Sequence, residues 1–158
     1  MTWQRGHDRI RDLLDNGELE QVPASETAAR QLLADAGRHL ASAHLAANSG
    51  DLGGAYQLAY DAFRKSAISL LAAQGLRATS KGGHIAVQDA VGAQFGNSVT
   101  AFRDFSRIRR ARNTFEYPSG EIVATPDQDD VADAVAAARR ARDAAVTILD
   151  QKVLTPWS

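Results

Sequence analysis

Apolar residues recur every three to four positions along most of the chain, which is the spacing of one face of an α-helix. Serine, aspartate or proline marks the beginnings of these segments, and glycine or asparagine marks several of their ends. The sequence therefore predicts helices over residues 6–16, 25–48, 51–74, 85–95, 98–117 and 127–153. Residues 75–84 and 118–127 are expected to be loops, the second with an extended piece at Ile122 and Val123.

The predicted helix 51–74 has the broadest apolar seam and is expected to be the central one. Alanine-rich contacts between it and helix 25–48 favour close packing in an antiparallel hairpin. The opposite side of the central helix is interpreted as a solvated face; it carries Gln57, Asp61, Arg64 and Lys65. His39 lies on the apolar stripe of helix 25–48 and is interpreted as a packed, hydrogen-bonded residue.

This pattern predicts an all-α fold, an up-and-down bundle of about five to six helices. A hydrophobic share of 44% with only 6% aromatic residues fits a mainly helical, water-soluble protein. We expect a single domain overall, with a short N-terminal helix and turn over residues 1–24 and the bundle over residues 25–153. At 158 residues the chain is long enough to bury a core.

The net charge of the chain and its lack of cysteine limit the kinds of functional site that it can have. The net charge of −1 does not by itself indicate a nucleic-acid ligand, although five arginines lie between residues 103 and 112. Cysteine is absent, which excludes disulfides, thiol catalysis and thiolate metal sites. No metal-binding spacing is visible and no cofactor is expected. With no signal-type segment and no apolar run of about 20 residues, we expect no membrane contact and a cytoplasmic location.

The segment from Ser98 to Pro118 carries the strongest functional signal. Read as one helix of about five turns, it places an apolar arc on one side: Ala101, Phe102, Phe105, Ile108, Ala111 and Phe115. Arg112 falls inside this arc, where an unpaired charge is costly. One interpretation is a structural pair with Glu116. The other is that the arc meets a second copy of the chain or a ligand, with Arg112, Asn113 and Tyr117 at the contact.

The loop before the predicted helix 85–95 contains Lys81, Gly82, Gly83 and His84. It lacks the spacing of a phosphate-binding loop, and no predicted strand precedes it. His84 is either a general base or the cap of the following helix, and the structural role is favoured.

With the helices in this order, the chain resembles the HEPN domain, a small all-α bundle found in prokaryotic toxin–antitoxin pairs, phage defence and nucleotidyltransferase-linked operons. Two stretches carry the resemblance, which covers about residues 25–152. The first runs from Ala55 to Ala67 and includes the following Gly75-Leu-Arg77 and Gly83-His84. The second is Arg109-Arg-Ala-Arg-Asn-Thr-Phe-Glu-Tyr-Pro118.

The family signature is an arginine, often followed by a polar residue, and a histidine four to six positions later; active members are metal-independent ribonucleases that join two such sites in a dimer. The resemblance gives Arg112 the arginine place, Asn113 the polar place and Tyr117 the histidine place. The residues expected to bind RNA or a nucleotide are Arg109, Arg110, Glu116 and His84. Because a tyrosine, with a pKa of about 10, is a poor base at neutral pH, we expect weak or absent cleavage.

The resemblance thus implies a homodimeric, toxin-like protein that acts on or binds RNA in a toxin–antitoxin or defence module. One alternative is a non-catalytic HEPN protein that binds a nucleotide or a partner nucleotidyltransferase, for which Tyr117 is a candidate acceptor. Another alternative is a helical interaction protein without a ligand.

Overall fold

The structure is a computed structural model that describes residues 3–120 and 123–158. Its elements are α1 (His7–Asp15), β1 (Leu19–Gln21), α2 (Glu26–Asn48), α3 (Leu52–Gln74), β2 (Leu76–Ala78), α4 (Gly83–Phe95), the 3₁₀-helix η1 (Thr100–Asp104), α5 (Phe105–Glu116) and α6 (Gln128–Asp150). The expected all-α helical bundle is confirmed, with one very small sheet added to it. The extended piece expected at Ile122 lies outside the described residues.

The helix boundaries follow the capping signals in the sequence. Ser25 accepts a hydrogen bond from the backbone N–H of Ala28, and Asp51 accepts one from that of Gly54. Asp127 and Asp130 form a reciprocal capping box at the start of α6. Gly75 ends α3 with a φ of +74°, and a Cβ at this position would lie 2.5 Å from the carbonyl oxygen of Val22. Only glycine fits both conditions.

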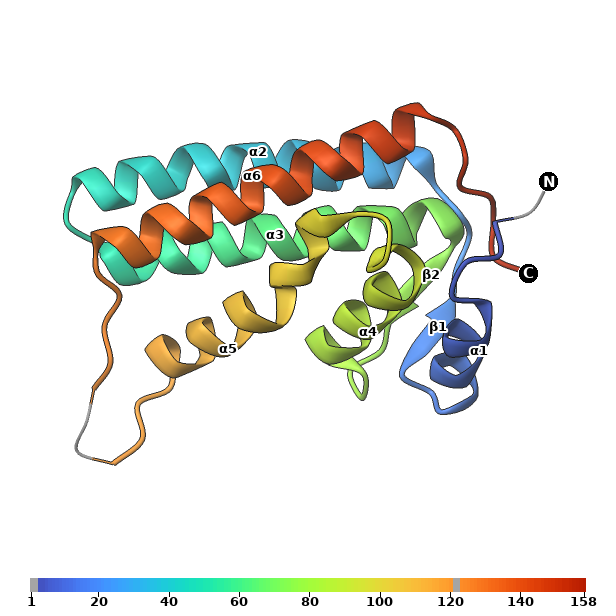
Figure 1. Ribbon diagram of the computed structural model, residues 1–158, viewed down its shortest axis with the longest axis horizontal. Coiled ribbons are helices and arrows are strands. Elements are labelled where there is room, and N and C mark those ends of the chain that lie inside the picture. The colour runs from blue at the N-terminus through green and yellow to red at the C-terminus, as the bar shows by residue number, and fades with distance from the viewer. Residues whose placement is uncertain (1–2, 121–122) are drawn as a thin grey trace.

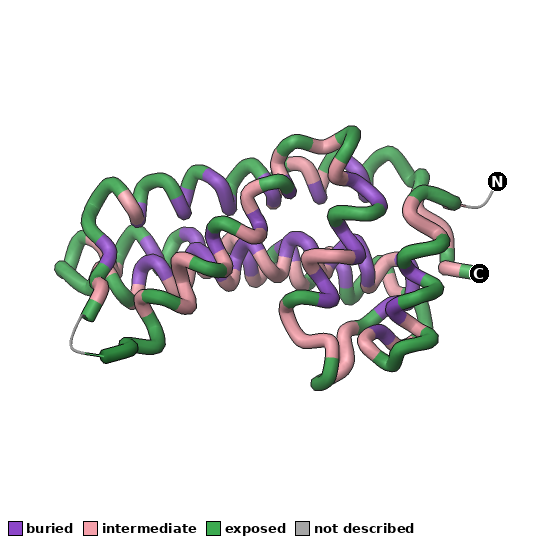
Figure 2. Tube along the Cα trace, turned by 60° about the horizontal axis from the view of Figure 1, so that its bottom comes forward, coloured by how far each residue is buried: buried purple, intermediate pink, exposed green. Residues whose placement is uncertain are grey.

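Three long helices, α2, α3 and α6, run side by side, and α5, α4 and α1 follow one another below them (Figure 1). The central helix is α3, as predicted, since it packs against α2, α4, α5 and α6. Buried positions face inward along the long helices (Figure 2). Many of them are alanines, which lets the helix axes approach closely.

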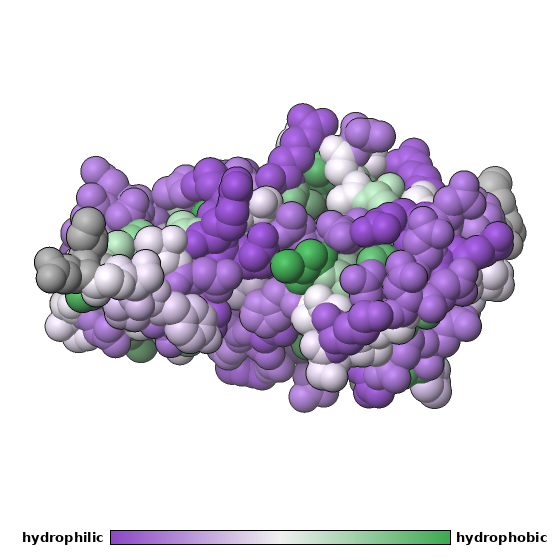
Figure 3. Space-filling model, turned by 90° about the horizontal axis from the view of Figure 1, so that it is seen from below, coloured by the Kyte–Doolittle hydropathy of each residue, from purple (hydrophilic) through white to green (hydrophobic). Residues whose placement is uncertain are grey.

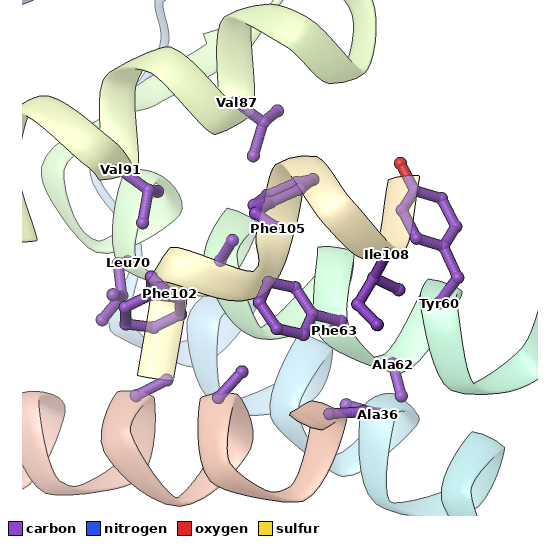
Figure 4. Close-up of a cluster of buried hydrophobic side chains, with 14 of the residues drawn as sticks. Ala36, Tyr60, Ala62, Phe63, Leu70, Val87, Val91, Phe102, Phe105 and Ile108 are labelled. Carbon is purple, nitrogen blue, oxygen red and sulfur yellow. The ribbon is translucent and has the colours of Figure 1, made fainter. Parts of the chain in front are cut away.

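An aromatic cluster joins α5 to this core (Figure 4). The rings of Phe105 and Phe63 meet edge to face with centroids 5.2 Å apart, and those of Phe102 and Phe63 do so with centroids 6.3 Å apart. Ile108 is fully buried beside them. Tyr60 closes the edge of the cluster, and its hydroxyl points away from the apolar side chains.

The prediction of one continuous helix from Ser98 to Tyr117 is wrong. The segment begins as the 3₁₀-helix η1 after Val99, which is extended, and becomes α-helical only at Phe105. In a 3₁₀-helix residues three apart lie on the same side, so this start lets both Phe102 and Phe105 face the core. The cap expected at Ser98 is therefore not formed.

The loop predicted over residues 75–84 contains strand β2, which pairs antiparallel with β1. Leu19 lies opposite Ala78, Glu20 opposite Arg77 and Gln21 opposite Leu76. Strands of three residues are too short to show an alternating pattern, so no periodic signal indicates them. In the described residues, none of the helices has the length and apolar character needed to cross a membrane.

Candidate functional site

Helix α5 places a guanidinium against the middle of α3. Ile108 is buried in the core, and Arg112, one turn later on the same side, reaches α3. Its Nε donates a hydrogen bond of 2.8 Å to Oε1 of Gln57, and its Nη1 donates one of 3.2 Å to Oδ1 of Asn113. These two amide oxygens fix the plane of the guanidinium.

Two aromatic rings complete the surroundings of Arg112. Its guanidinium carbon lies 5.5 Å from the ring centroid of Tyr60 and 5.6 Å from that of Tyr117. Both distances are in the range of cation–π contacts. Tyr60 is buried, whereas Tyr117, at the C-terminal end of α5, is 65% exposed. The guanidinium of Arg112 therefore has a buried ring, Tyr60, on the side of the core and an exposed ring, Tyr117, on the side of the solvent.

Within the described part of the chain, no carboxylate lies within 4 Å of the Arg112 guanidinium. Arg107, on the other side of the same helix, differs: it forms ion pairs with Asp104 and Asp133, and their hydrogen bonds raise the pKa of its guanidinium above the ordinary value. Helix α5 thus has one side with neutralised arginine charge and one side whose charge is available to an anion.

His84, in the first turn of α4, extends the site. Its Nδ1 lies 2.7 Å from the hydroxyl of Tyr60, and the two rings lie 5.6 Å apart between centroids. Burial, with the charges of Arg64 and Arg112, lowers the pKa of His84 below the usual 6.5. Its imidazole is therefore mainly neutral at pH 7.

The Tyr60 hydroxyl determines which imidazole nitrogen carries the proton. Burial raises the pKa of Tyr60 to about 12, so its O–H is intact at neutral pH. The described residues offer this hydroxyl one hydrogen-bond partner, Nδ1 of His84. Because a buried O–H without an acceptor is costly, Tyr60 donates to Nδ1. Nε2 then carries the hydrogen, and His84 is suited to donate to an anion rather than to act as a base.

Two further arginines surround His84. Arg109 donates from Nε to Oε1 of Gln88 on α4, with a distance of 3.0 Å. Arg64 on α3 pairs with Asp61, which also lies close to Lys65. Burial alone would raise the pKa of Asp61, but Arg64 and Lys65 outweigh it and lower this pKa. One carboxylate therefore faces several cations, which leaves the cluster positive. We call the three arginines Arg64, Arg109 and Arg112, together with the neutral His84, the cationic cluster.

The structure brings together five of the seven residues that the sequence singled out: Arg112, Asn113, Tyr117, Arg109 and His84. Arg110 and Glu116 do not join them. Arg110 is exposed and lies about 200° around the helix from Arg112. Glu116 is also exposed, and the ion pair considered for Arg112 and Glu116 is not formed among the described residues. His84 is not a helix cap either, because Gly82 occupies that position.

Three residues of the site were missed by the sequence analysis: Gln57, Tyr60 and Arg64. Gln57 and Arg64 were placed on a solvated face of helix 51–74. In the structure Gln57 contacts Arg112, and Arg64 forms an ion pair with Asp61. Tyr60 is buried, and no periodic pattern distinguishes it from the other core residues of α3. The only available signal was the stretch from Ala55 to Ala67 that carries the family resemblance.

The hypothesis that the apolar arc of residues 101–115 meets a second copy of the chain is wrong. Phe102, Phe105 and Ile108 are buried within the single chain, so they are not free to meet a second copy. The face that carries α4 and α5 is largely hydrophilic, and its apolar atoms form small separate patches (Figure 3). A homodimer therefore remains a prediction, and Tyr117 at the end of α5 is exposed.

Comparison with known proteins places this site inside a recognised domain. A family model of the HEPN domain matches residues 29–149, which include α3, α4 and α5 with the whole cationic cluster. No curated protein and no solved structure matches the chain. Among the described residues, no group of three or more histidine, aspartate or glutamate side chains is arranged to hold a metal ion.

Proposed function

The chain belongs to the HEPN family, and on this premise we propose that it binds RNA through the cationic cluster of α3, α4 and α5. The observation that carries the proposal is Arg112, a partly buried guanidinium that is held by two amide oxygens and lacks a carboxylate partner in the described chain. Such a group is preorganised for a phosphate, which it can contact with its remaining N–H donors.

RNA is favoured over a simple anion by the residues beside Arg112. Tyr117 is exposed next to the guanidinium and offers a ring on which an unpaired base can stack. Arg109 and Arg64 add charge along the same surface, as a phosphate backbone requires. His84 adds an N–H donor at Nε2.

We propose that this binding serves a toxin-like role with weak or absent RNA cleavage. Cleavage beside a 2′-hydroxyl needs a base near neutral pKa. The position that carries histidine in the family signature is Tyr117 here, and the His84 tautomer makes that imidazole a donor. A homodimer and a partner nucleotidyltransferase that modifies the exposed Tyr117 belong to the same proposal.

Binding of a fluorescent single-stranded RNA, measured by anisotropy between 50 and 200 mM salt, tests the proposal. Arg112→Ala should weaken binding at least tenfold, because a hydrogen-bonded charge contributes about 1.5–3 kcal/mol. Arg109→Ala should lower the slope of log affinity against log salt by about one. The matched control is Arg107→Ala on the same helix, whose charge is already neutralised and whose loss should leave the slope unchanged. Absent binding at 50 mM salt, or an equal effect of Arg107→Ala, would contradict the proposal.

A further inference from the structure

A groove adjoins the cationic cluster between α3, β2 and α4. Its volume is about 280 Å³, near the lower end of ligand pockets. The floor is aliphatic and consists of Ile68, Leu71, Leu76 and Val87, while Arg64, Arg77, Ser80 and His84 lie on its polar rim. Arg64 and His84 belong to both the groove and the cationic cluster, so the two are continuous.

The groove runs along the free edge of β2. It is lined by five consecutive residues, 76–80, whereas one face of a strand would contribute only alternate residues. None of the β1 residues lines it, so the edge concerned is the one opposite β1.

Backbone donors and acceptors on this edge have no partner within residues 3–120 and 123–158. Val22 N–H bonds to the Gly75 carbonyl, and Thr79 N–H bonds to the Glu18 carbonyl. In an antiparallel pair with this register, the N–H and C=O of Leu76 and Ala78 point away from β1. The described residues provide no hydrogen-bond partner for these four groups.

We propose that this groove binds the base of a nucleotide whose phosphate lies at the cationic cluster. The inference rests on the proposed function and adds the subsite that holds a base. A nucleobase has two apolar faces, which suit the aliphatic floor, and an edge of donors and acceptors, which suits the N–H and C=O groups of β2. An added peptide strand fits less well, because β2 offers a pairing edge of only about 10 Å.

Adenosine monophosphate and ribose 5-phosphate provide the test, because they share the phosphate and differ in the base. In ¹⁵N-labelled protein, adenosine monophosphate should shift the amide signals of Leu76, Ala78 and His84, and should bind at least tenfold more tightly than ribose 5-phosphate. Ribose 5-phosphate should shift His84 without shifting Leu76 or Ala78. Equal affinities, or the same shifted amides for both compounds, would overturn the inference.

Ala78→Pro sharpens the test, since it removes an N–H that plays no part in pairing with β1. Adenosine monophosphate should bind about fivefold more weakly, and ribose 5-phosphate equally well. Ala78→Gly keeps the N–H and should leave both affinities within about twofold of wild type. If Ala78→Pro does not fold, the wild-type comparison of the two compounds still decides.

The inference and the proposed function can fail separately. If RNA binds in an Arg112-dependent way while the two small compounds behave alike, the groove does not hold a base and the RNA site stands. If RNA does not bind but adenosine monophosphate shifts the β2 amides, the groove holds a base and the RNA proposal falls. An unrelated extended peptide that shifts Leu76 and Ala78 more strongly than adenosine monophosphate would also overturn the base assignment.

Discussion

The hydroxyl of Tyr60 lies 2.7 Å from Nδ1 of His84 and links a core residue of α3 to the first turn of α4. This bond sets the imidazole tautomer, with the hydrogen on Nε2. Tyr60→Phe keeps the apolar packing and removes the bond, so we expect a loss of about 1 kcal/mol in the free energy of unfolding. RNA affinity should fall severalfold, because His84 no longer presents a fixed donor.

Imidazole ¹⁵N chemical shifts check this prediction directly. The wild type should show one tautomer of His84, and Tyr60→Phe should show a mixture. The matched control is Tyr56→Phe, which alters the same helix away from His84. A mixed tautomer in the wild type would contradict the assignment of His84 as a donor.

The stability of the protein should depend on the charge of His84. Its pKa is below 6.5 in the folded chain because of burial and the charges of Arg64 and Arg112, with Arg109 contributing and Asp61 opposing. The unfolded chain therefore binds the proton more readily, and the free energy of unfolding falls as the pH drops from above 6.5 through the folded pKa.

Urea unfolding at pH 7.5 and pH 5 measures this effect. His84→Gln removes the titrating group, so its midpoint should change less between the two pH values than that of the wild type. Equal changes in both proteins would show that His84 does not contribute.

Because Ile108 is completely buried in the single chain, truncating it should destabilise the monomer itself. Ile108→Ala should cost about 2–5 kcal/mol in the free energy of unfolding. Thr114→Ala, an exposed position on the same helix, should stay within about 0.5 kcal/mol of wild type. The loss should be the same at every protein concentration, and a loss that grows on dilution would instead place Ile108 in a dimer contact.

Tyr117→His should raise RNA cleavage, because it puts an imidazole at the family's histidine position beside Arg112. General-base catalysis contributes about 10²–10⁴-fold, so an increase of at least a hundredfold is expected. The products, a 2′,3′-cyclic phosphate and a free 5′-hydroxyl, can be followed on a gel. Efficient cleavage by the wild type that disappears in Tyr117→Phe would reverse this view and make Tyr117 catalytic.

Local signals in the sequence were enough to place most of the helices. Ser25, Asp51 and Gly75 act at the helix ends where they were expected. The buried positions at the start of α2 are Ala29 and Leu33, although Ala28 and Leu32 beside them are equally apolar. Alanine and leucine recur so densely there that neighbouring stripes are equally apolar.

The site was harder to predict from the sequence than the helices, because it is made by contacts between three helices. Arg112 was recognised as an anomaly on an apolar face, and its partner was sought on the same helix, at Glu116. The structure provides that partner from α3, as the amide of Gln57, 55 residues away in sequence. A neutral residue at such a separation leaves no pattern in a single sequence.

Arg112 lies four residues after Ile108 on α5, so the burial of Ile108 in the core determines where the charge of Arg112 lies. Burial of Ile108 fixes the rotation of α5 about its axis, and that rotation directs the guanidinium toward Gln57. Inserting one residue between them would turn Arg112 by about 100° and separate it from Gln57. A change of residue type at 112 alters one contact. A change of chain length here would instead rotate the whole α5 side of the site about the helix axis.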